Sequence, residues 1–105
     1  MNTATVANSM VVAETIRAQI GNMAFTLLGA SALAGDHNSL QFSIKGCKRI
    51  NKIRIELNAL DTYTVHFYKY NRSTFECPEV SCVDFVYADN LHSVIESETG
   101  LYCRF

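Results

Sequence analysis

The stretch NKIRIELNALDTYTVHFYK, residues 51–69, decides the predicted fold, because apolar and polar residues alternate on both sides of a short turn. Such alternation is typical of strands that bury one face. The two apolar faces coincide only if the directly opposed pairs are Leu57 with Tyr63, Ile55 with Val65 and Ile53 with Phe67. That register requires a loop of odd length, most simply residues 59–61, because a two-residue loop would turn one apolar set outward.

A further strand is predicted upstream, at residues 40–44, where Leu40, Phe42 and Ile44 alternate with polar residues. The cluster GDHNS at 35–39 predicts the turn before it. The three strands together form an antiparallel meander. An edge at 40–44 that is uncharged and β-prone would favour a homodimer through the sheet edge, or capture by a partner.

The N-terminal part is predicted to be helical. Val12, Ile16 and Ile20 recur at the spacing of one helix face over residues 6–20, and Gly21 supplies the stop. A short second helix is expected over 23–28, closed by Gly29. Residues 18–35 carry no charge, but their polar residues and glycines favour a buried helical segment over a membrane span.

A C-terminal helix is predicted over residues 81–98. Ser81 followed by Asp84 resembles a capping box, and the apolar residues Val83, Tyr87, Leu91 and Val94 follow at helical spacing. Gly100 is the expected C-cap. The fold class is therefore α+β, with N-terminal helices, a three-stranded antiparallel meander and a C-terminal helix, in a single domain over residues 1–105.

Catalytic and metal-binding motifs are not evident in the sequence. The four cysteines and three histidines lack the spacing of a zinc site, and the absence of an export signal favours reduced thiols. We find no nucleophile beside a base, no paired carboxylates and no phosphate-binding glycine loop. The sequence therefore predicts neither an enzyme nor a cofactor.

Charge is distributed unevenly. Residues 1–54 carry six Lys or Arg against two acidic residues, a net charge of +4, whereas residues 55–105 carry three against eight, a net charge of −5. Five cations fall in KGCKRINKIR at 45–54, and two tyrosines and a histidine occupy the polar side of the following strand. The predicted partner-binding residues are Lys45, Lys48, Arg49, Lys52, Arg54, His66, Tyr68 and Tyr70.

This basic stretch has three interpretations. It is a surface that binds an acidic protein, a surface that binds nucleic acid, or a solvated loop without a partner. A formal net charge of −1 for the whole chain weighs against nucleic acid as the main partner, because non-specific affinity depends on neutralising phosphates.

Residues 51–69, with the ending VIESETGLYCRF, resemble a group of small proteins encoded in tailed phages, prophages and mobile elements. The resemblance rests on the hairpin pattern NxLDxYxV at 58–65 and on TGLY at 99–102. It implies a setting, the cytoplasm of a bacterial host, and no catalytic residues. The expected function is a non-enzymatic accessory protein that binds a host or phage protein complex, in the manner of an anti-CRISPR inhibitor of host defence. The alternative is a single-stranded nucleic-acid-binding accessory of phage replication or recombination.

Overall fold

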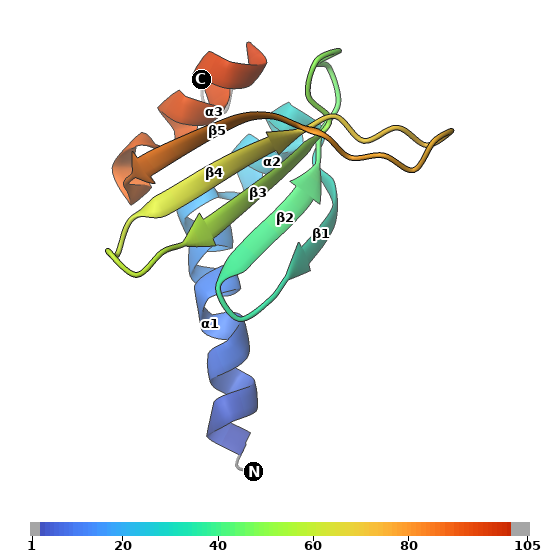
Figure 1. Cartoon of the computed structure of the whole chain (residues 1–105). Helices are drawn as coiled ribbons and strands as arrows, with labels where there is room; N and C mark the ends of the chain where they lie inside the picture. The colour runs from blue at the N-terminus through green and yellow to red at the C-terminus, as the bar shows by residue number, and fades with distance from the viewer. Residues whose placement is uncertain (1–2, 102–105) are drawn as a thin grey trace.

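A computed structural model of the chain describes residues 3–101, with side chains described from Val11 onward. It contains a five-stranded antiparallel sheet in the order β1-β2-β3-β4-β5, with the helices on one face (Figure 1). The strands are β1 (Ser31–Gly35), β2 (Ser39–Ser43), β3 (Lys52–Leu57), β4 (Tyr63–Tyr68) and β5 (Glu79–Val86). The helices are α1 (Thr3–Ile20), α2 (Asn22–Leu28), the 3-10 turn η1 (Ala88–Asn90) and α3 (Leu91–Thr99). Tyr102 and Cys103 lie outside the described residues.

The central hairpin has the predicted register. Leu57 pairs with Tyr63, Ile55 with Val65 and Ile53 with Phe67. The Asn58 N–H donates to the Thr62 carbonyl at 2.9 Å, which leaves residues 59–61 as a three-residue loop. Asp61 closes this loop with φ at 66°, the left-handed conformation that such loops place at their last residue.

The core lies between the helices and one face of the sheet. Phe42 of β2, Ile55 of β3 and Val65 of β4 are fully buried, as are Ile16 of α1 and Ile95 of α3. These apolar residues lie on the face that the helices cover, so the polar residues between them lie on the opposite face, which we call the open face.

The N-terminal helices begin and end near the predicted residues. Gly29 closes α2 in the left-handed conformation, and its N–H donates to the Thr26 carbonyl at 3.1 Å. The first turns of α1 extend beyond the sheet (Figure 1). Among the described residues, none of the helices has both the length and the apolarity needed to cross a membrane.

The sequence analysis placed residues 30–35 in a buried segment after the second helix and predicted no strand there, whereas residues Ser31–Gly35 form β1, an exposed edge strand. β1 pairs with β2, so residues 40–44 do not form the predicted sheet edge. Four of these five residues, Ser31, Ala32, Ala34 and Gly35, are small and give little local indication of a strand, so pairing with β2 decides the conformation.

The predicted helix start at Ser81 is also wrong. Residues Glu79–Val86 form β5, which pairs with β4, and α3 begins only at Leu91. The Ser81 hydroxyl donates to the Glu98 carboxylate instead of capping a helix. The sheet therefore has five strands rather than three. The predicted C-cap is confirmed, since Gly100 is left-handed and its N–H donates to the Glu96 carbonyl at 2.8 Å.

Candidate functional site: a basic hollow and an ionic network

The basic segment connecting β2 to β3 is held against the rest of the molecule. Ile50 is fully buried, and the Lys45 N–H donates to the Leu28 carbonyl at 3.0 Å. Gly46 has φ at 97°, and a Cβ atom there would lie 3.1 Å from Leu101 Cδ2, so the backbone approaches Leu101 closely. Because of these anchors, the neighbouring cations project from a fixed backbone rather than from a freely solvated loop.

Arg49 makes an intramolecular contact. Its guanidinium donates to the main-chain carbonyl of Glu98 at 2.7 Å, in the last turn of α3. A cation at this position satisfies a terminal carbonyl and complements the helix dipole. Lys48 is exposed, as Arg49 is, but its side chain makes no hydrogen bond or ion pair within the described part of the chain.

Three cations from three segments line one hollow of about 580 Å³. Lys45 follows β2, Lys52 begins β3, and Arg72 lies in the connection between β4 and β5. None of the three has an ion-pair partner among the described side chains. We call this feature the basic hollow; its lining residues are Ser31, Ala32, Ser43, Ile44, Lys45, Asn51, Lys52, Tyr70 and Arg72.

Tyr70 is fixed at the hollow by Asn51. The Asn51 Nδ2 donates to the Tyr70 carbonyl at 2.9 Å, and its Oδ1 accepts the Tyr70 N–H at 2.7 Å. Tyr70 is 37% exposed and lines the hollow together with the three cations. The hollow therefore combines positive charge with one aromatic surface.

Arg54, by contrast, is neutralised on the open face. Its guanidinium lies 3.8 Å from the Asp36 carboxylate and 3.4 Å from that of Glu56. The Asn38 N–H and then the Ser39 hydroxyl, followed by Arg54, hold the pKa of Asp36 below its usual value. Two carboxylates of the same chain therefore compensate the charge of Arg54, whereas the cations of the basic hollow have no such neighbours among the described ion pairs.

The network continues from Glu56 to His66. Nε2 of His66 lies 3.5 Å from Glu56 Oε1, and Nδ1 contacts the Glu79 carboxylate directly. The His66 ring also stacks on Tyr68, with ring centroids 6.1 Å apart and an interplanar angle of 17°. Burial, and next the charge of Glu79, raise the pKa of Tyr68.

Cys82 completes a cluster on the same face. It pairs with His66 across β4 and β5, and donor atoms of His66, Glu79 and Cys82 all lie within 4.8 Å of one another. Desolvation, and next the charge of Glu79, raise the pKa of the Cys82 thiol. Reasoning from spacing missed this cluster, because strand pairing and not a short motif brings the three residues together.

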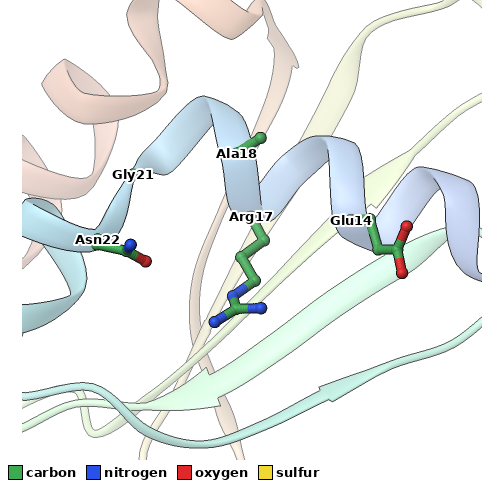
Figure 2. Close-up of a pocket in the computed structure, with 5 residues that line it drawn as sticks. All are labelled: Glu14, Arg17, Ala18, Gly21 and Asn22. Carbon is green, nitrogen blue, oxygen red and sulfur yellow. The ribbon is translucent and has the colours of Figure 1, made fainter.

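A separate hollow of about 470 Å³ lies near the junction of α1 and α2 (Figure 2). Glu14 and Arg17 come from successive turns of α1, and Asn22 begins α2. Its five lining residues, which include Ala18 and Gly21, contain neither a nucleophile beside a base nor a pair of carboxylates. This composition gives no indication of catalysis.

The predicted site residues thus fall into separate groups. Lys45, Lys52 and Tyr70 meet at the basic hollow, together with Arg72, which the sequence analysis did not select. The residues Arg54, His66 and Tyr68 belong to the ionic network of the open face. Arg72 could have been predicted from its position two residues after Tyr70, because residues i and i+2 of an extended chain lie on the same side.

Comparisons of the chain with protein-family models, with curated proteins and with solved structures found no match. The resemblance to phage and mobile-element proteins therefore stays a prediction from the residues quoted for it. The geometry of the basic hollow and of the open face carries the functional argument.

Proposed function

We propose that the protein is a non-enzymatic binding protein whose basic hollow docks on an acidic surface of a larger protein complex. The observation that carries this proposal is the convergence of Lys45, Lys52 and Arg72 on one hollow without ion-pair partners among the described residues. Like charges held together repel, and an acidic surface relieves that repulsion. Charge complementarity of this kind accelerates association and selects the partner.

The resemblance to small phage and mobile-element proteins supports a setting for this activity. In the proposal, the protein works in the cytoplasm of a bacterial host and occupies a surface of a host defence complex, as an anti-CRISPR-like inhibitor does. The described hollows give no support to an enzyme, because their lining residues do not combine a nucleophile with a base.

The test compares two triple variants with the same change of net charge. One replaces Lys45, Lys52 and Arg72 by Ala, and the control replaces Arg17, Lys48 and Lys69, which lie outside the lining of the hollow. The native protein is used to isolate its partner from a bacterial host lysate, and association with the purified partner is then measured at several salt concentrations.

We expect the hollow variant to associate more slowly and to lose most of the salt dependence, while the control retains both. Circular dichroism checks that both variants fold. Native-like binding by a folded hollow variant would contradict the proposal.

A second candidate function is binding of single-stranded nucleic acid. It is favoured by Tyr70, whose accessible ring stands among the three cations, since bases stack on such rings while cations contact the phosphates. Fluorescence anisotropy with a labelled single-stranded oligonucleotide tests it. Binding that Tyr70→Ala weakens, together with recovery of nucleic acid and no protein from the lysate, would favour this function over the first.

A further inference from the structure

The register of β4 and β5 brings three different metal-binding donors together on the open face. His66 and Cys82 are directly opposed, and a register shift between Phe67 and Tyr68 places Glu79 opposite Tyr68. A nitrogen, a carboxylate oxygen and a sulfur consequently lie within 4.8 Å of one another. Two hydrogen-bonded strands hold these residues, so the cluster is built on rigid elements.

This donor set matches the preferences of zinc. Zn²⁺ binds imidazole nitrogen, carboxylate oxygen and thiolate sulfur at about 2.0–2.3 Å, which places donors of a tetrahedral site roughly 3.4–3.8 Å apart. The three donor atoms lie within 4.8 Å of one another, which is close to that spacing. A zinc ion between His66 and Glu79 would replace their present direct contact by two metal bonds.

The other nitrogen of His66 provides an independent observation. Nε2 is buried and makes no hydrogen bond within the described part of the chain, and the nearby carboxylate oxygen, Glu56 Oε1, lies 3.5 Å away. Metal-binding histidines commonly donate their second N–H to a carboxylate, which fixes the tautomer and the orientation of the ring. Glu56 is placed to do this, and it leaves Nδ1, which contacts Glu79, as the nitrogen for the ion.

We propose that His66 Nδ1, the Glu79 carboxylate and Cys82 Sγ form a zinc site with an open fourth position, in which Glu56 is a positioning residue. The site lies on the open face and shares no residue with the lining of the basic hollow. The ion would link β4 to β5, so zinc would stabilise the fold as well as occupy the site.

The experiment uses the full chain, reduced and freed of metal by a chelator, and Co²⁺ as a spectroscopic probe. We expect binding of one ion per chain, with a thiolate-to-cobalt absorption band in the near ultraviolet that Zn²⁺ abolishes by displacement. Cys82→Ser and His66→Ala should lose the band. Cys77→Ser is the matched control, since Cys77 is also an exposed free cysteine, and it should retain the band.

Two further measurements separate the proposal from its alternatives. Zinc should raise the melting temperature of the native chain and of Cys77→Ser but not of Cys82→Ser, while Glu56→Gln should weaken zinc affinity about 10–100-fold. A band that survives in folded Cys82→Ser, or one that Cys77→Ser removes, would overturn the proposed site. Because the hollow triple variant should bind zinc normally, failure of either proposal leaves the other testable.

Discussion

The guanidinium of Arg49 reaches the main-chain carbonyl of Glu98, 49 residues later in the chain, with 2.7 Å between Nη2 and O. This contact ties the β2–β3 connection to the last turn of α3. The basic segment therefore contains both an intramolecular anchor and cations that are open to a partner. Arg49 and its neighbour Lys48 form a matched pair for separating these roles.

Replacement of Arg49 by Ala should lower the free energy of unfolding by about 0.5–1.5 kcal/mol, because a terminal carbonyl of α3 loses a charged donor. Lys48→Ala should stay within about ±0.5 kcal/mol. Urea denaturation of both variants measures the difference. Equal stabilities would show that the Arg49 contact contributes nothing to folding.

Asn58 organises the β3–β4 turn, since its Oδ1 accepts the Leu60 N–H at 2.9 Å and its Nδ2 donates to Thr62 Oγ1 at 2.8 Å. We expect Asn58→Ala to cost about 1–2 kcal/mol of stability, because two local hydrogen bonds are lost. The control is Leu60→Ser, whose native side chain is exposed. Thermal unfolding measures both variants. A lower melting temperature for Leu60→Ser than for Asn58→Ala would contradict this role of Asn58.

Asp36 should make stability depend on acid pH. Its folded pKa lies below the ordinary value of 3.8, chiefly because the ionised carboxylate accepts the Asn38 N–H. Its stabilising contribution is therefore complete above pH 3.8 and is lost as the pH falls through the lower folded value. Asp36→Asn should be less stable than the native chain at pH 7, with the difference shrinking below pH 3.8. Denaturation at pH 7, 5 and 3 measures this, and a difference independent of pH would refute it.

Phe75 combines a strained backbone with an exposed side chain. Its φ is 59° and its residue is 77% exposed, in the connection that projects between β4 and β5 (Figure 1). We expect Phe75→Gly to raise the free energy of unfolding by about 0.5–1 kcal/mol, because glycine accepts this conformation, and Phe75→Ala to change little. If both variants lost stability in chemical denaturation, the ring would have a structural role.

The sequence predicted self-association through an edge at residues 40–44, but the edges of the sheet are β1 and β5. β1 has a register shift between Ser31 and Ala34, and β5 has one near Phe85, where φ is 58°. Irregular edges hinder addition of a further strand, so we expect a monomer in analytical ultracentrifugation. A dimer would contradict this, and Leu33→Pro or Val80→Pro would then identify the edge that pairs.

Local patterns of apolar and polar residues were enough to predict the central hairpin and the helix ends. The register of Ile55 with Val65 followed from alternation and loop length, because a shift of one residue would expose a whole apolar face. Gly29 and Gly100 end their helices as predicted. A helix commonly ends at a residue in the left-handed conformation, which glycine adopts without steric cost, so the residue type alone marks the end.

The two outer strands, β1 and β5, form because of pairing between segments that the local patterns did not predict. Residues 31–35 and 79–86 had weak or misleading local patterns. They are strands because their backbones pair with β2 and β4, which would otherwise be the edges of the sheet. The same pairing assembled both candidate sites: it placed Cys82 beside His66, and the ends of the strands brought Arg72 to Lys45 and Lys52. Such contacts depend on hydrogen bonds between segments far apart in the chain, which spacing along the sequence does not encode.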